Sequence, residues 1–181
     1  MVILEGNETQ KKYKYNTMSV EEKKIAEGVA PLKCWDIFSI YLNVLNQRSN
    51  NQEDIQYLLG LKSIYEWDAD FLTILDSYYD ALVLTDSSIQ IQWVNDGFHE
   101  MTGYENSEVI GRSPKMLQGE KTSKSSRSFI REKLSGTRPF NTEVINYRKN
   151  GEEYLCQVTI HPLLNMEGNV SHFLALETKA A

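Results

Sequence analysis

The side chains of this chain best suited to metal binding or nucleophilic chemistry are three histidines and two cysteines. His99, His161 and His172 lack the HxxxH or HxxE spacing that presents ligands to a metal. Cys34 and Cys156 are too few for a disulfide framework or a thiolate zinc site. Only His99 falls in an expected helix, where it could serve as an axial haem ligand, and nothing else supports that role. With no Ser-His-Asp set, CxxC pair or phosphate loop, we expect no enzyme activity.

Two short helices are predicted in the stretch NDGFHEMTGYENSEVIGRSPKMLQG, which begins at Asn95. Either Asn95 or Asp96 can cap the first helix, and Gly103 ends it. Either Asn106 or Ser107 can cap the second one. Helices this short are unstable alone, because nucleation is costly, so they must lie on a sheet.

This stretch and the segments after it resemble the PAS domains. The matching residues are Val94, Asn95, Asp96, Phe98, Thr102, Gly103, Tyr104, Glu108, Ile110 and Gly111. LQG at 117–119, NYRKNG at 146–151 and TIHPL at 159–163 are similar to the flavin-binding LOV branch of that family. The resemblance covers Asp80–Thr178 and implies an α+β fold, with a five-stranded antiparallel sheet and short helices on one face.

The LOV branch traps blue light by joining a cysteine to its flavin, within a motif similar to GRNCRFLQG. The corresponding residues here are Gly111–Gly119, which read GRSPKMLQG, and Pro114 stands where the resemblance places the cysteine. Because proline has no thiol, the resemblance implies that light forms no adduct at this position.

Four residues match positions that hold the flavin noncovalently in the LOV branch. Lys115 and Arg131 match two arginines that bind the flavin phosphate, and both are cationic. Gln118 and Asn146 match residues that hydrogen-bond the cofactor. The alternative interpretation is that the two cations are solvated helix charges and that the two amides satisfy local backbone groups.

Two further positions differ from the LOV pattern. Cys156 replaces a second asparagine, and Glu177 replaces a glutamine that faces the flavin ring. Losing such polar contacts matters, because an unpaired buried polar group costs about 1–3 kcal/mol. We therefore expect no cofactor, and noncovalently bound flavin mononucleotide remains the alternative. Cys156 is expected to be a small buried apolar side chain.

Alternation and turn signals predict the elements of the sheet. Expected strands are Ala81–Thr85, Ile89–Val94, Phe140–Arg148, Glu153–His161 and Val170–Thr178, and the one longer helix is Ser123–Leu134. Asn150-Gly151 is a strong hairpin signal between the third and fourth strands.

Period-two alternation predicts which side chains of the last three strands share the face that meets the short helices. They are Val144 and Asn146, then Tyr154, Cys156, Val158 and Ile160, then Phe173, Ala175 and Glu177. Such a wall is mostly apolar with a few polar points, as in a small-molecule site. Because Tyr154 and Phe173 are large, we expect them to fill most of the space and to leave only a small cavity.

The chain before the sheet divides into a flexible tail, residues 1–16, and a helical extension, residues 17–79, which precede the PAS-like domain at 80–179. Leu32–Leu45 has apolar residues around much of a helix. A further helix begins near Asn51 with Leu58 and Leu59 on its apolar side, and Asp68 or Asp70 can cap another that contains Phe71. These helices must pack on the sheet, on each other or on a second copy. We expect a homodimer held largely by residues 31–79.

Composition limits the remaining functions. The net charge of −6 provides no basic surplus for nucleic acid, and no apolar run is long enough to cross a membrane. Two cysteines and no signal peptide indicate the cytoplasm. The sequence therefore predicts a noncatalytic sensory or regulatory module that responds to a small ligand or partner. It would signal through its flanking helices and dimerisation to a downstream signalling protein. A noncovalent flavin sensor and a pure interaction module with a filled core are the alternatives.

Overall fold

The structure is a computed structural model that describes residues 52–180. The predicted tail at 1–16, the helix at Leu32–Leu45 and the other predictions before residue 52 lie outside the described residues. Residues 52–180 fall within one compact unit, Asn50–Ala181.

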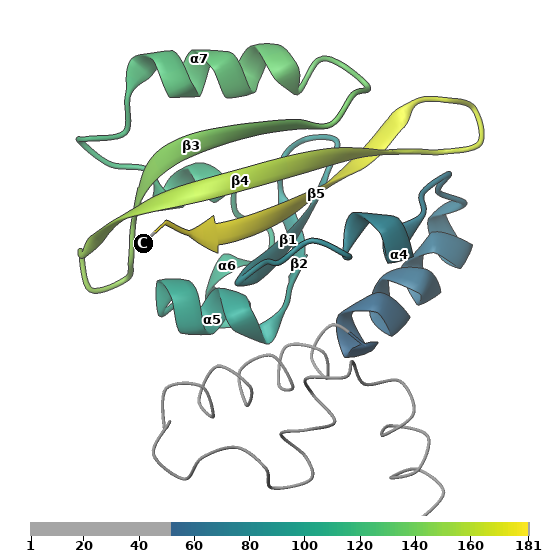
Figure 1. Cartoon of the computed structure of the whole chain (residues 1–181), viewed down its shortest axis with the longest axis horizontal. Coiled ribbons are helices and arrows are strands. Elements are labelled where there is room, and N and C mark those ends of the chain that lie inside the picture. The colour runs from purple at the N-terminus through teal and green to yellow at the C-terminus, as the bar shows by residue number, and fades with distance from the viewer. Residues whose placement is uncertain (1–51, 181) are drawn as a thin grey trace, which may run out of the picture. The chain divides into compact units, whose positions relative to one another are not determined.

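Five antiparallel strands form a single sheet, as predicted (Figure 1). The strands are β1 (Ala81–Asp86), β2 (Ile91–Val94), β3 (Phe140–Tyr147), β4 (Glu153–Leu164) and β5 (Val170–Lys179). Their order across the sheet is β2-β1-β5-β4-β3, so β5 is the central strand. Because β5 pairs on both sides, its inward side chains have no open sheet edge beside them.

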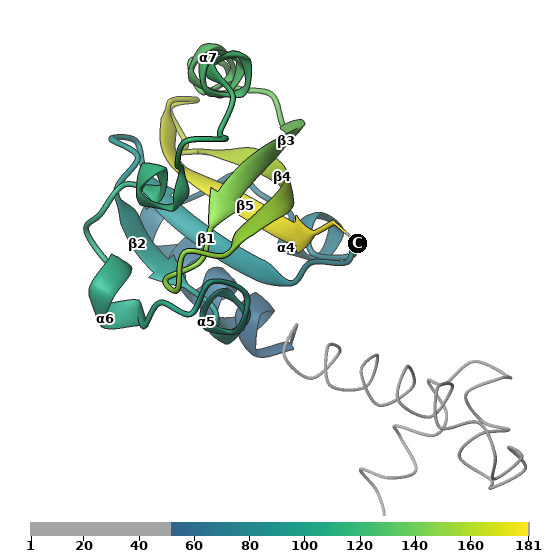
Figure 2. The ribbon, with the colours of Figure 1, turned by 90° about the vertical axis from the view of Figure 1, so that its left-hand side faces the viewer.

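Four short helical elements connect β2 to β3, and three of them contact particular strands. They are α5 (Asp96–Thr102), α6 (Asn106–Val109), the 3-10 helix η1 (Pro114–Leu117) and α7 (Lys124–Lys133). α5 packs against β1, α6 against β2 and α7 against β3 (Figure 2). The predicted α+β architecture is therefore confirmed. η1 and α7 border a pocket on this face of the sheet.

Asn95 is the N-cap residue of α5, one of the two predicted, whereas both residues predicted to cap α6 were wrong. Asn95 precedes α5 but makes no side-chain cap; its Oδ1 accepts from the Leu82 backbone N–H at 2.8 Å. Its Nδ2 donates to Asp54 Oδ2 at 3.0 Å. Glu105 caps α6 in place of Asn106 or Ser107, through a capping box in which the Glu105 backbone N–H donates to Glu108 at 2.9 Å. Asn95 is buried beside β1, so its amide pairs with buried groups that would otherwise lack partners.

The two faces of the sheet support two separate hydrophobic clusters, because successive side chains of a strand point to opposite faces. On β1, Ala81 and Val83 belong to the inner cluster with Phe98. Leu82 and Leu84 belong to the outer cluster. Other buried members of the outer cluster include Leu58, Trp67, Phe71 and Leu75.

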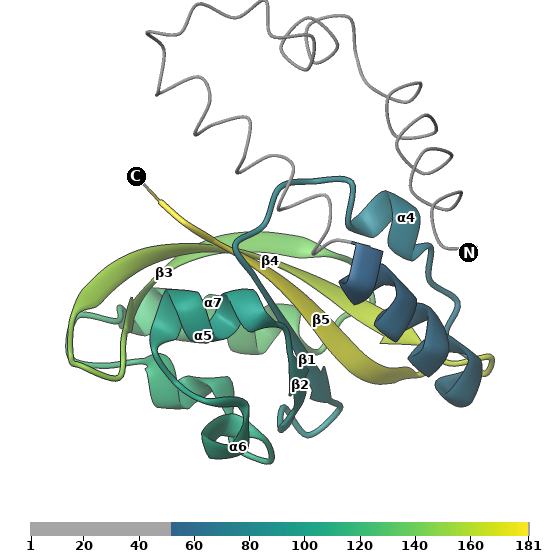
Figure 3. The same cartoon turned by 90° about the horizontal axis from the view of Figure 1, so that it is seen from below.

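The described part of the helical extension covers the outer face. Residues 52–65 form a helix, and α4 (Phe71–Ile74) follows with Asp70 as its cap. Figure 3 shows both on the opposite side of β1 and β5 from α5 and α6. Leu58 is fully buried, whereas Leu59, predicted on the same apolar side, is 42% exposed. Packing on the sheet, one of the three options left open by the sequence, is therefore confirmed for this segment.

A buried carboxylate ties this outer helix to the sheet. Asp54 Oδ2 accepts from Tyr79 Oη and from Asn95 Nδ2, both at 3.0 Å. Burial raises the pKa of Asp54, and these two hydrogen bonds partly oppose that rise. Asp54 therefore joins helix 52–65, the segment before β1 and the start of α5 in one polar cluster.

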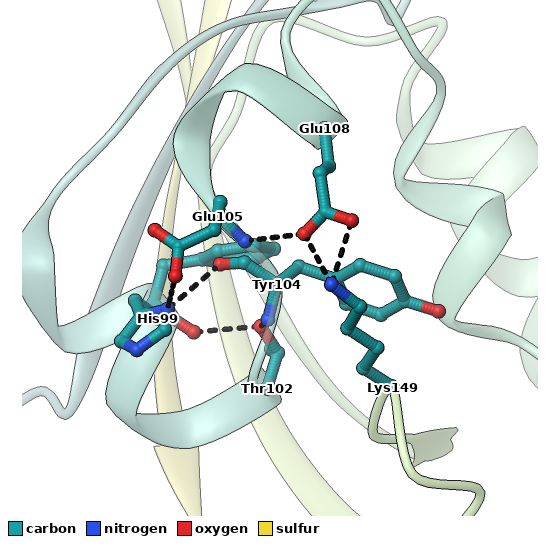
Figure 4. A network of polar contacts seen from close by, with 7 residues as sticks. His99, Thr102, Tyr104, Glu105, Glu108 and Lys149 are labelled. Atoms are coloured by element: carbon teal, nitrogen blue, oxygen red, sulfur yellow. Dashed lines mark hydrogen bonds and ion pairs between the residues drawn. The ribbon is translucent and has the colours of Figure 1, made fainter.

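A second network fixes the turn between α5 and α6 (Figure 4). Lys149, in the hairpin between β3 and β4, donates to both carboxylate oxygens of Glu108 at 2.6 and 2.7 Å. Its backbone N–H donates to the Thr102 carbonyl oxygen at 2.9 Å. The Lys149 ammonium lowers the pKa of Glu108. The Asn150-Gly151 turn predicted from the sequence therefore also positions an anchor for the helical face.

Candidate functional site

A pocket of about 690 Å³ lies between the inner face of the sheet, η1 and α7. Its apolar wall is built mainly from the last three strands and includes Val144, Val158, Ile160, Phe173 and Ala175. These residues are on the face that alternation predicts. The volume falls within the range of about 300–1,000 Å³ that is usual for ligand sites.

The prediction of only a small cavity was wrong. Phe173 is buried and lines the pocket as part of its wall, and a space of about 690 Å³ remains beside it. Tyr154 does not line the pocket; the Arg148 guanidinium lies over its ring, 4.9 Å from the centroid. The size of the space depends on how far α7 and η1 stand from the sheet, and this distance is not encoded in the alternation of any strand.

Two residues with side-chain amides line the pocket next to each other. Gln118 follows η1, Asn146 belongs to β3, and the two residues form an isolated antiparallel bridge. Both line the pocket, and Asn146 is buried. An amide offers a donor and an acceptor together, so this pair can recognise the edge of a polar heterocycle.

Three cations line the same pocket. Lys115 comes from η1, and Arg127 and Arg131 come from α7. Arg127 donates from Nη2 to the Gly119 carbonyl oxygen at 2.6 Å, and its buried Nε has no hydrogen-bond partner. The sequence analysis missed Arg127. The signal was present, because Arg127 and Arg131 are four residues apart and so share one face of a helix.

Glu177 provides the one carboxyl group among the residues that line this pocket. The residue is 5% exposed, and its Oε2 is buried without a hydrogen-bond partner. Burial raises the pKa of Glu177 to about 7, although a hydrogen bond with Cys156 acts in the opposite direction. Such a carboxyl changes charge close to neutral pH.

Cys156 is the one predicted site residue that does not line the pocket. It is fully buried next to Glu177, and burial raises the pKa of its thiol. A thiol in this environment stays protonated and is a poor nucleophile. The structure therefore gathers Lys115, Gln118, Arg131, Asn146 and Glu177 around one space, with Cys156 behind Glu177.

The histidines lie elsewhere. His99 is exposed on α5 with Nδ1 3.2 Å from the Tyr104 carbonyl oxygen (Figure 4). His161 is half-buried on β4, and His172 packs against Trp67 with ring centroids 4.9 Å apart. Within residues 52–180, no three histidine, cysteine, aspartate or glutamate side chains gather closely enough to hold a metal ion.

Comparison with known families identifies this arrangement. The PAS domain family matches residues 80–178, which is more than half of the chain. This chain belongs to the PAS domain family. The match begins one residue before β1 and ends one residue before the end of β5, so the PAS domain contains the whole sheet and the pocket.

Sequence relatives of this PAS domain occur in regulatory proteins. A nitrogen fixation regulatory protein of Klebsiella oxytoca is 29% identical over 107 residues, which is 59% of this chain and 22% of that protein. A blue-light-activated histidine kinase of Brucella ovis is 34% identical over 85 residues, which is 47% of this chain and 17% of the kinase. The chain thus spans about a fifth of the length of these relatives. Its PAS domain is homologous to the sensor regions of such proteins.

Solved structures similar to this PAS domain include LOV domains. A light-oxygen-voltage domain studied with a flavin analogue is 32% identical with a TM-score of 0.57, and the match covers 63% of this chain and 87% of that one. The LOV domain of a blue-light activated histidine kinase from Erythrobacter litoralis is 26% identical with a TM-score of 0.54, covering 58% and 99%. In the part of the chain that the structure describes, no helix is both long and apolar enough to span a membrane.

Proposed function

We propose that this PAS domain binds a small planar ligand noncovalently and acts as a noncatalytic sensor. The observation that carries the proposal is the pocket of about 690 Å³, in which an apolar wall meets Gln118, Asn146 and Glu177. A pure interaction module needs no empty space, because a core filled by side chains would serve it equally well. A space of this volume with convergent polar groups instead favours a ligand.

Flavin mononucleotide is the ligand class that these residues fit best. Gln118 and Asn146 can hydrogen-bond the polar edge of the ring, and Lys115 and Arg131 can bind the phosphate. The unpartnered Nε of Arg127 adds a donor on the same helix as Arg131. When bound, a flavin would supply absorption of blue light and electron-transfer chemistry. Pro114 lines the same pocket and offers no thiol, so this chain would hold the flavin without a covalent bond.

Titration with flavin mononucleotide tests the proposal directly. We expect saturable binding at one site per chain, observed as quenching of flavin fluorescence, because the ring becomes enclosed by Phe173 and the strand wall. Blue light should then cause no reversible loss of flavin absorbance, since Pro114 has no thiol to form an adduct. Pro114→Cys should bind flavin and gain that reversible bleaching. No binding by the unmodified protein would refute the flavin proposal, and bleaching without Pro114→Cys would refute the role of Pro114.

We also propose that the chain forms a homodimer through residues 31–79 and passes its signal to a downstream signalling protein by this route. Support comes from apolar side chains left exposed on the described part of this segment: Ile64 is 70% exposed and Leu72 is 65% exposed. Sedimentation of the whole chain at high micromolar concentration should show a dimer. Combining Ile64→Glu and Leu72→Glu should weaken the dimer while preserving the fold, because neither side chain is buried. A monomeric unmodified chain would contradict the proposal.

A further inference from the structure

Glu177 lies near the C-terminal end of β5, the central strand of the sheet. On β5 it pairs with Ala81 of β1 on one side and with Val158 of β4 on the other. Its side chain faces the pocket and is 5% exposed. The carboxyl group therefore cannot reach bulk water along a sheet edge, and its only open direction is the pocket.

The carboxyl has no cation paired with it. Among residues 52–180 Glu177 takes part in no ion pair, and its buried Oε2 has no hydrogen-bond partner. Burying a charged carboxylate without a partner is very costly, so such a group takes up a proton instead. Burial accordingly raises the pKa of Glu177 to about 7.

The groups that face Glu177 do not supply the missing charge. The titratable or charged groups that interact with Glu177 or its neighbours, or that line the same pocket, are Asp80, Tyr154, Cys156, Lys179, Lys115, Arg127 and Arg131. The pKa values of Tyr154 and Cys156 are raised, so both stay neutral near pH 7. Asp80 accepts from the Lys179 backbone N–H at 2.7 Å. Four cations remain, Lys179 on β5 and Lys115, Arg127 and Arg131 from η1 and α7. Among the described residues none of them forms an ion pair with Glu177.

We infer that Glu177 binds the pocket's ligand as a neutral carboxylic acid, donating a hydrogen bond from its protonated oxygen to an acceptor on the ligand. This inference rests on the proposed function, because it requires a ligand in the pocket. An acceptor such as a ring nitrogen or a carbonyl oxygen would satisfy the donor, whereas an anionic carboxylate would repel it. Ligand binding therefore takes up a proton when the pH lies above the pKa of Glu177, and the sensor responds to pH as well as to ligand.

The sign of the pH effect follows from which form binds. Below pH 7 most molecules already carry the proton, and binding costs nothing extra. Above pH 7 the proton must be acquired first, so the dissociation constant rises about tenfold for each further pH unit. With a pKa of about 7, affinity should fall about tenfold between pH 6 and pH 8.

Riboflavin is the appropriate probe for this titration. It carries the flavin ring but no phosphate, whose own ionisation near pH 6 would otherwise change attraction to the cations. For the unmodified chain we expect the tenfold loss of riboflavin affinity between pH 6 and pH 8. Glu177→Gln keeps a donor that does not titrate, so its affinity should be the same at both pH values. Glu143→Gln is the matched control, because Glu143 is exposed on the outward side of β3, and it should behave as the unmodified chain.

Direct titration of the Glu177 carboxyl tests the protonation of Glu177 separately from the binding of flavin. In protein with carbon-13-labelled glutamate, the carboxyl signal that disappears in Glu177→Gln should titrate near pH 7 without ligand. A midpoint near the ordinary value for glutamate, or equal riboflavin affinity at pH 6 and pH 8, would overturn the inference while leaving flavin binding intact. Failure of both riboflavin and flavin mononucleotide to bind at any pH would refute the flavin proposal, and the coupling with it.

Discussion

Gly97→Ala should destabilise the folded protein by about 3 kcal/mol, at the upper end of the cost of overpacking. Gly97 is the second residue of α5, and a Cβ there would come within 1.9 Å of the Asp80 backbone oxygen and 3.1 Å of its carbonyl carbon. The obstacle is backbone held in place, because the Asp80 N–H donates to the Glu177 carbonyl oxygen at 2.8 Å. The helix must therefore move, and Phe98 and Met101 of the inner cluster move with it.

Gly60 offers a matched control within the same compact unit. It lies in helix 52–65, and a Cβ there would meet nothing within 4 Å. Gly60→Ala should stabilise the protein by up to about 1 kcal/mol, because alanine favours a helix over glycine. Urea unfolding followed by tryptophan fluorescence measures both changes as shifts in the midpoint at constant slope. Equal midpoints for Gly97→Ala and the unmodified chain would show that α5 does not contact β1 as closely as described.

Combining Lys115→Gln and Arg131→Gln should weaken binding of flavin mononucleotide about 100-fold while leaving riboflavin affinity nearly unchanged. Each cation can give the phosphate a charge-assisted hydrogen bond worth about 1.5–3 kcal/mol. Because both side chains are exposed, we take slightly less than the lower end of that range for each, about 2.7 kcal/mol in total, which corresponds to the 100-fold change. Calorimetric titration with both flavins at fixed ionic strength measures the difference, which should shrink as salt is added.

The control for this pair removes the same charge elsewhere. Combining Arg112→Gln and Lys133→Gln removes two positive charges, as the first pair does. Arg112 lies just before η1 and Lys133 lies on α7, and neither residue lines the pocket. That variant should bind flavin mononucleotide nearly as well as the unmodified chain. An equal loss in both double variants would mean that only the general field of the protein attracts the phosphate. An equal loss for riboflavin would mean that the pocket itself was damaged.

Local sequence determined most of the architecture. Alternation from Phe140 to Thr178 predicted three strands and the face that each turns inward, because a strand buries every second side chain. Asn150-Gly151 predicted the β3–β4 hairpin, since these residues accept the turn that such a hairpin needs. The ends were less accurate: β4 continues to Leu164, three residues beyond the prediction, because β5 continues to pair with it there.

Contacts between distant residues decided the details that local sequence could not. Asn95 has the residue type of a helix cap, yet its side chain pairs with Leu82 and with Asp54, 41 residues earlier in the chain. Leu58 and Leu59 are both apolar, but only the packing of helix 52–65 on the outer face determines which one is buried. A propensity describes a residue and its neighbours, so it cannot include a partner that folding brings from elsewhere.

Sequence determined some features of the pocket, and tertiary structure decided the others. Sequence alone, with its resemblance to the LOV branch, selected five residues that line one space, because motif positions fix which side chains share a face. It did not determine the volume of that space, the presence of Arg127 in its wall or the raised pKa of Glu177. Volume depends on the separation of α7 and η1 from the sheet. The pKa of Glu177 depends on the central position of β5, where burial excludes water, and on the lack of an ion pair with Glu177 among residues 52–180.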